Sequence, residues 1–126
     1  MAGTLTVVLA VGANAATVQE SVTVVDPLAD YVSFRATVDT FYADLGDIPP
    51  DNFTGDATAR VGAFLAVLEG INPDECYAER FVTEEYAATA ILAWLTAPPE
   101  YDAYGSAALG LGTTLHEYAA GLAVTC

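Results

Sequence analysis

Apolar residues recur at steps of three and four along most of the chain, which predicts a set of amphipathic helices. The first predicted helix begins at Asp26 and Pro27, because aspartate caps a helix and proline is tolerated at its first position. It ends at Gly46, a residue type common just after a helix. The second predicted helix covers about residues 56–69 and ends at Gly70.

The third and fourth predicted helices form a hairpin. Asn72 followed by Pro73, with Glu75 at the third helical position, predicts the start of the third helix. A new cap at Thr83 would divide this helix and raise the helix count from four to five. Two consecutive prolines, 98 and 99, predict its end, and the fourth helix is predicted over about residues 100–123.

The fourth predicted helix carries a regular apolar seam. Its members alternate steps of three and four, which predicts an inward face packed on neighbouring helices. The seam consists of Tyr101, Tyr104, Ala108, Leu111, Leu115, Tyr118 and Leu122. The same segment contains four glycines, each costing about 1 kcal/mol of helix stability relative to alanine. Glycines 105, 110, 112 and 121 therefore indicate either close backbone contact or, at 110 and 112, bends.

The N-terminal segment has two interpretations. Residues 1–19 carry no charged side chain, residues 5–11 form an apolar run interrupted only by Thr6, and Ala13-Asn14-Ala15 has the small-x-small form of a signal-peptidase site. Under this interpretation residues 1–15 are a secretory signal, residues 16–26 an extended lead-in, and residues 27–126 the helical domain. The alternative is a β-hairpin of residues 4–11 and 17–25 that turns at residues 12–14.

Composition supports one helical domain. The chain has 126 residues, a length typical of one domain and short for two. Apolar residues make up 54% of it, which is enough to form one hydrophobic core. The chain has 17 acidic residues, three arginines and no lysine, which give it a net charge of −14. Such a surface repels phosphate backbones and anionic lipid, so we expect no nucleic-acid partner. The apolar N-terminal run is too short to span a bilayer, and we expect no transmembrane segment.

The two cysteines predict a disulfide. The arm from Cys76 to the prolines rises about 31 Å and the returning arm about 35 Å, so an antiparallel hairpin brings Cys126 back to Cys76. A metal site needs about four ligands, which two cysteines and one histidine do not supply. The alternative is two free thiols in a reducing compartment. The fold class predicted is thus all-α, a small four- to five-helix bundle with a disulfide-tied C-terminal helical hairpin, in a secreted, extracellular protein.

Candidate chemistry is sparse. His116, beside Glu117, is the only side chain of a type that can act as a base near neutral pH. No serine lies in a nucleophile elbow. No glycine-rich loop follows a strand and opens a helix, so no phosphate site is predicted. Asp44, Asp47, Asp51 and Asp56 gather around one loop, either as helix caps and turn residues or as weak oxygen ligands for calcium. We therefore assign no catalytic residue, no metal site and no cofactor.

Aromatic residues supply the last candidate site. Trp94, Tyr101, Tyr104 and Tyr118 lie in the predicted hairpin, where aromatics either fill the core or line an apolar cavity between helices. The leading interpretation is a secreted, acidic, non-enzymatic interaction or structural protein that binds a protein partner or associates with its own copies. The alternative is a carrier of a small hydrophobic ligand, held in a cavity lined by these four residues.

Overall fold

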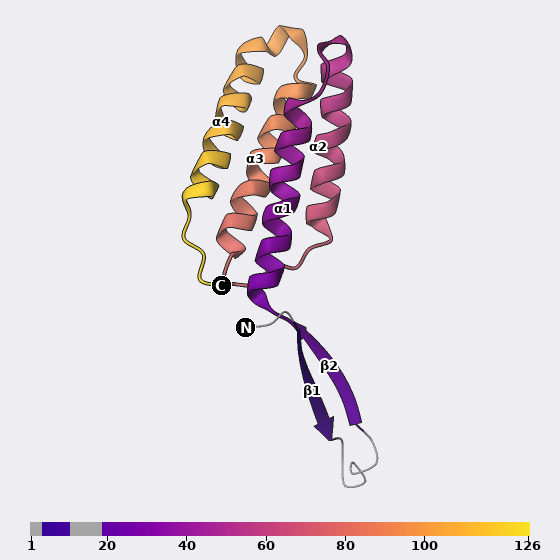
Figure 1. Cartoon of the computed structure of the whole chain (residues 1–126). Helices are drawn as coiled ribbons and strands as arrows, with labels where there is room; N and C mark the ends of the chain where they lie inside the picture. Colours follow the sequence, from indigo (N-terminus) through magenta and orange to yellow (C-terminus); the bar gives the residue numbers. More distant parts are fainter. Residues whose placement is uncertain (1–3, 11–18) are drawn as a thin grey trace.

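The computed structural model describes residues 4–10 and 19–126 and, for side chains, residues 26–126. Within these residues four α-helices run side by side as a bundle (Figure 1). They are α1 (Pro27–Gly46), α2 (Phe53–Glu69), α3 (Ala78–Thr96) and α4 (Asp102–Gly121). Short 3₁₀ helices, η2 (Pro50–Asn52) and η3 (Pro99–Tyr101), precede α2 and α4. The predicted all-α four-helix bundle is confirmed.

The start of α1 was predicted correctly and the start of α3 was not. The Asp26 side chain accepts a hydrogen bond from the Leu28 backbone N–H at 3.1 Å, which caps α1. The third helix begins at Ala78 instead of after Asn72. Here the Asp74 side chain accepts the Cys76 N–H at 3.0 Å, a local bond that stabilises a turn in place of helix.

The predicted division of the third helix at Thr83 is absent. The Thr83 hydroxyl donates to the Glu79 carbonyl at 2.8 Å, the i to i−4 bond that a threonine makes inside a continuous helix. The second helix begins three residues earlier than predicted, at Phe53, because η2 leads directly into it. The fourth is shorter than predicted, because η3 takes up its first turn and the helix ends at Gly121.

Two strands precede the bundle. Strands β1 (Thr4–Ala10) and β2 (Gln19–Val25) pair antiparallel, with Val7 opposite Val22. They occupy the positions of the predicted β-hairpin. The predicted turn at residues 12–14 and the predicted cleavage site after Ala15 lie outside the described residues, and cleavage stays a prediction.

The core lies between α1, α2 and α3 and is built from aromatic rings. Phe34 of α1 packs against Phe81 of α3 with ring centroids 5.3 Å apart. Phe41 of α1 stacks on Phe64 of α2, with centroids 4.0 Å apart and planes within 5°. Such large side chains hold these helices apart while removing much apolar area from water.

Helix α4 packs differently, through its smallest residues. Its buried positions are Gly105, Ala108, Gly112 and Ala119, whereas Tyr101, Tyr104, Leu111 and Tyr118 are 55–61% exposed. The predicted inward seam is therefore wrong at these four positions. The physical reason is that small residues let two helix backbones approach closely, so the glycine and alanine face is the one that meets α3.

Two glycines show how close this approach is. A Cβ placed on Gly112 would lie 2.7 Å from the Ile91 side chain and 3.0 Å from the Ala87 carbonyl oxygen. A Cβ on Gly105 would lie 3.2 Å from that of Ala97. The predicted close contact is confirmed at these two positions, whereas a Cβ on Gly110 would meet nothing within 4 Å.

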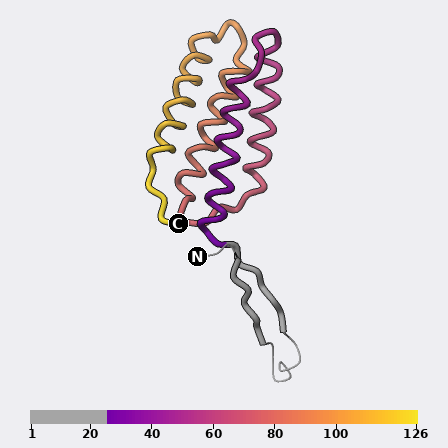
Figure 2. Tube along the Cα trace, viewed as in Figure 1, coloured from indigo at the N-terminus to yellow at the C-terminus, as the bar shows by residue number. Residues whose placement is uncertain are grey.

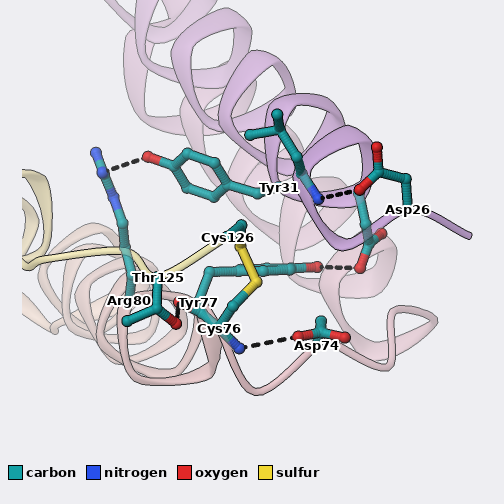
Figure 3. Close-up of a disulfide and its surroundings, with 10 residues drawn as sticks. Asp26, Tyr31, Asp74, Cys76, Tyr77, Arg80, Thr125 and Cys126 are labelled. Carbon is teal, nitrogen blue, oxygen red and sulfur yellow. Dashed lines mark hydrogen bonds between the residues drawn. A yellow bond between two sulfur atoms is a disulfide. The ribbon is translucent and has the colours of Figure 1, made fainter. Parts of the chain in front are cut away.

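The predicted disulfide joins Cys76 to Cys126, with Cα atoms 5.1 Å apart (Figure 3). The backbone N–H of Thr125 donates to the Cys76 carbonyl at 3.1 Å, and the Tyr77 hydroxyl donates to Asp30 at 2.9 Å. These contacts return the C-terminus to the end of the bundle where α1 begins (Figure 2). Closing a loop of 50 residues stabilises the fold by about 4 kcal/mol in the chain-entropy model.

Candidate functional site

An open apolar groove lies between α3 and α4, with a volume of about 460 Å³. We call it the α3–α4 groove. Its residues are Tyr86, Thr89, Ala90 and Ala93 from α3, and Tyr104, Ala107, Ala108, Leu111 and Leu115 from α4. Tyr86, Tyr104 and Leu111 are 64%, 61% and 55% exposed, so large side chains form the rims. Buried alanines 90 and 108 form its floor.

The close approach of α4 to α3 shapes this groove. Contact at Gly105 and Gly112 brings the helices together, so the alanines beside them leave a shallow channel instead of a filled interface. The larger residues of each helix then stand on either side of it. Small residues at the contact and large ones at the rims are both properties of the sequence, and together they produce an exposed apolar channel.

The groove also lies in the charge-free part of the chain. Residues 86–99 and 103–115 contain no acidic or basic side chain, although the whole chain carries a net charge of −14. Every residue that lines the groove is uncharged. An apolar, charge-free surface rimmed by exposed aromatics is typical of the centre of a protein interface.

The four aromatic residues predicted to line a cavity lie in different surroundings. Tyr104 lines the groove. Trp94 is half-buried against the core, its ring centroid 6.1 Å from that of Phe53. Tyr101 and Tyr118 are exposed and are not among the residues that line the groove.

Sequence reasoning missed the α3 wall of the groove. Tyr86, Ala90 and Ala93 follow one another at steps of four and three, so they form a second apolar stripe on α3 beside the core stripe. That stripe was a usable signal. A helix with apolar residues on two faces has a second surface to cover.

A polar cluster, formed by Glu84, His116 and Tyr42, lies at another face of the same helix pair. Nδ1 of His116 on α4 lies 2.8 Å from Oε1 and 3.0 Å from Oε2 of Glu84 on α3. The Glu84 side chain is 1% exposed and that of His116 is 32% exposed. The Tyr42 ring of α1 stacks on the imidazole, with centroids 3.8 Å apart. The acidic partner of His116 is therefore Glu84, 32 residues away in sequence, and not its exposed neighbour Glu117.

Burial governs the protonation of this cluster. Burial raises the pKa of Glu84 above its ordinary value, while the hydrogen bond and charge of His116 and the charge of Arg80 partly oppose that rise. Burial, with the nearby Glu84, also raises the pKa of Tyr42. The Tyr42 hydroxyl oxygen is buried and has no hydrogen-bond partner among the described residues.

The polar cluster connects three helices, α1, α3 and α4. It borders a cavity of about 220 Å³ whose other residues are Phe34, Arg35, Val38, Asp39, Arg80 and Ala120. None of these residues is a serine, threonine or cysteine, so the cavity holds no hydroxyl or thiol of these three types beside His116. The arrangement links α4 to α3 through the His116–Glu84 contact and to α1 through the stacked Tyr42 ring.

In the part of the chain described, no three His, Cys, Asp or Glu side chains come together as a metal site would require. Of the four loop aspartates, Asp44 lies 3.8 Å from Arg60, and Asp56 accepts a hydrogen bond from the Asn52 amide at 3.3 Å. None of the described helices combines the length and apolarity needed to cross a membrane.

Comparison with protein-family models, with curated proteins and with solved structures finds no match for this chain.

Proposed function

We propose that this chain is a secreted, non-enzymatic interaction protein that binds the apolar face of a helix in the α3–α4 groove. The observation that carries the proposal is the groove itself, apolar, uncharged and exposed in a chain of net charge −14. A channel between two adjacent helices is the place where a third helix packs, with its side-chain ridge in the channel.

The energetics favour an apolar helix as the occupant. Fully covering a large apolar side chain contributes about 1.5–3 kcal/mol, and Tyr86, Tyr104 and Leu111 are each more than half exposed. No charged group in the groove needs to lose its water when it is covered. The occupant is therefore a helix face without charges, whose leucine-sized side chains fit above the alanine floor.

The disulfide supports the secretory part of the proposal. A Cys76–Cys126 bridge forms and persists in oxidising compartments, and both cysteines of the chain are in it. The apolar N-terminal run, with its small-x-small site before residue 16, supports secretion independently of the disulfide.

The second candidate function is a carrier of a small hydrophobic ligand. A volume of about 460 Å³ lies in the range of small-molecule sites, and its lining is apolar and aromatic. The groove is open along the surface, however, and would leave much of a small ligand in water. Mass spectrometry of organic extracts of the native protein tests this function, which predicts one co-purifying lipid or aromatic compound in near-stoichiometric amount.

The helix-binding function is tested with a fluorescein-labelled amphipathic helical peptide. Its apolar face consists of leucine and alanine and carries no charge. Anisotropy is measured on the wild type and on Leu111→Glu, which places a carboxylate on the rim of the groove. Val32→Glu, on α1 and 56% exposed, is the matched control. We expect binding by wild type and Val32→Glu, and at least tenfold weaker binding by Leu111→Glu. Equal affinity for all three proteins, or none for any, would refute the proposal.

A further inference from the structure

The exposed face of α4 has the repeat of a helix-pairing seam. Tyr104, Leu111 and Tyr118 are spaced by seven residues, and Ala108 and Leu115 lie between them at the intermediate positions. This is the a and d pattern by which one helix packs along another. Tyr104, Leu111 and Tyr118 are more than half exposed, so α3 leaves the large residues of this seam uncovered, whereas Ala108 is buried beside them.

The same seam forms one side of the α3–α4 groove. Tyr104, Ala108, Leu111 and Leu115 all line it, over a helix rise of about 16 Å. A helix that fills the groove therefore needs an apolar, uncharged stripe of about the same length. Residues 103–115 of α4 carry no charge and present such a stripe.

We propose that the helix seated in the α3–α4 groove is α4 of a second copy of this chain, running antiparallel to the first. The inference rests on the proposed helix-binding function and names its partner. One surface then supplies both the groove and the helix that fills it, which is the self-complementary arrangement of a two-fold dimer. The two hairpins, α3 with α4 from each copy, form a four-helix bundle across the interface.

Seam residues pair well in this orientation. With the two-fold axis between residues 108 and 111, Ala108 of one copy lies opposite Leu111 of its partner, a small side chain against a large one. Tyr104 then lies opposite Leu115, and Tyr101 opposite Tyr118, so each of these six positions has an apolar counterpart. A parallel arrangement would instead place Leu111 against Leu111 and leave Ala108 against Ala108.

Charge distinguishes a second copy from other occupants. Two chains of net charge −14 repel one another, and a charge-free face is where they meet with the least repulsion. Salt screens the remaining repulsion, so the dimer should strengthen as ionic strength rises. A helix of a basic partner would respond in the opposite direction.

The test combines assembly state with register. Sedimentation velocity on the full chain, at low and high salt, should show a monomer–dimer equilibrium that shifts towards dimer with salt. Leu111→Glu should weaken dimerisation at least tenfold, and Val32→Glu should leave it unchanged. For register, Tyr101→Cys and Tyr118→Cys chains are mixed and mildly oxidised. The antiparallel dimer predicts mainly the mixed cross-link, identified by mass, because residues 101 and 118 face each other across the axis.

Two outcomes overturn the inference. The first is a chain that stays monomeric at high concentration and high salt, which would mean that the groove does not bind a second copy. The second is a cross-link formed mainly between two Tyr101→Cys chains, which would mean that the dimer is parallel. Neither outcome decides the proposed function, because peptide binding is measured at protein concentrations low enough for monomer. A monomer that binds the leucine–alanine peptide keeps the helix-binding function and loses this partner.

Discussion

Nδ1 of His116 lies 2.8 Å from Oε1 of Glu84, a carboxyl group that the fold buries almost completely. This contact joins α4 to α3 on one face of the helix pair, while the α3–α4 groove opens on another. Burying a carboxylate is costly unless it is paired, so this imidazole offsets part of the cost of burying Glu84.

Replacing Glu84 by glutamine should change how stability depends on pH. Since burial raises the pKa of Glu84, the folded chain binds this proton more tightly than the unfolded chain does. Stability from this group is therefore present below its ordinary pKa of 4.5 and is lost as pH rises from there through the raised value. Glu84→Gln should flatten the decline of Tm with pH over that window, measured by thermal denaturation.

The control for this prediction is Glu85→Gln, which removes a carboxylate next in sequence but largely outside the cluster. Its curve of Tm against pH should run parallel to that of the wild type. Parallel curves for Glu84→Gln as well would show that this carboxyl group does not titrate differently in the folded state.

Removing the imidazole should be costly. His116→Ala leaves Glu84 buried without its hydrogen-bond donor, and breaking a buried pair from one side destabilises a protein by about 3 kcal/mol. Glu117→Ala, which changes the exposed neighbour, should alter stability by less than about 0.5 kcal/mol. Urea denaturation of both variants measures the difference, and similar midpoints for the two would contradict the structural role of His116.

Two glycines of α4 should respond oppositely to alanine. At Gly112 the added Cβ would meet the Ile91 side chain and the Ala87 carbonyl, and overpacking of this kind costs about 1–3 kcal/mol. At Gly110 it would meet nothing, and alanine should stabilise the helix by about 0.5–1 kcal/mol. The free energies of unfolding should therefore move in opposite directions, and equal shifts would mean that α4 does not approach α3 as described.

Opening the disulfide should loosen the end of the bundle where α1 begins. Cys76→Ser with Cys126→Ser should lower the free energy of unfolding by about 2–4 kcal/mol, since the unfolded chain regains its freedom. The intact mass of the wild type, alkylated without reduction, should show no free thiol. Two alkylated thiols would remove both the bridge and its support for secretion.

Local signals predicted the fold well. The cap at Asp26 and the prolines at 98 and 99 marked helix boundaries and so predicted the number of helices. The similar lengths of the two hairpin arms predicted the disulfide. The start of α3 was misplaced because Asp74 stabilises a turn with its own backbone neighbours. A cap-like motif and a turn share the same residue types, so only the tertiary context separates them.

The candidate site was harder to predict, for a physical reason. Periodicity identifies an apolar face of a helix but does not show what covers that face. The large residues of the α4 seam were therefore assigned to the core, although Gly105 and Gly112 are the residues that pack against α3. Close packing of small residues competes with burial of large ones, and their relative gains depend on the neighbouring helix. The contact of His116 with Glu84 joins residues 32 apart, and no spacing along the chain encodes it.

The most direct test of the account is NMR mapping of the surface that a helix occupies. The leucine–alanine peptide is titrated into ¹⁵N-labelled full chain at a concentration where the chain is monomeric. We predict that the largest shift changes fall on Tyr86, Ala90, Ala93, Tyr104 and Leu111, with little change around Phe41 and Phe64 on the far side of the core. Shift changes centred on α1 and α2, or none at saturating peptide, would contradict the assignment of the α3–α4 groove as the binding surface.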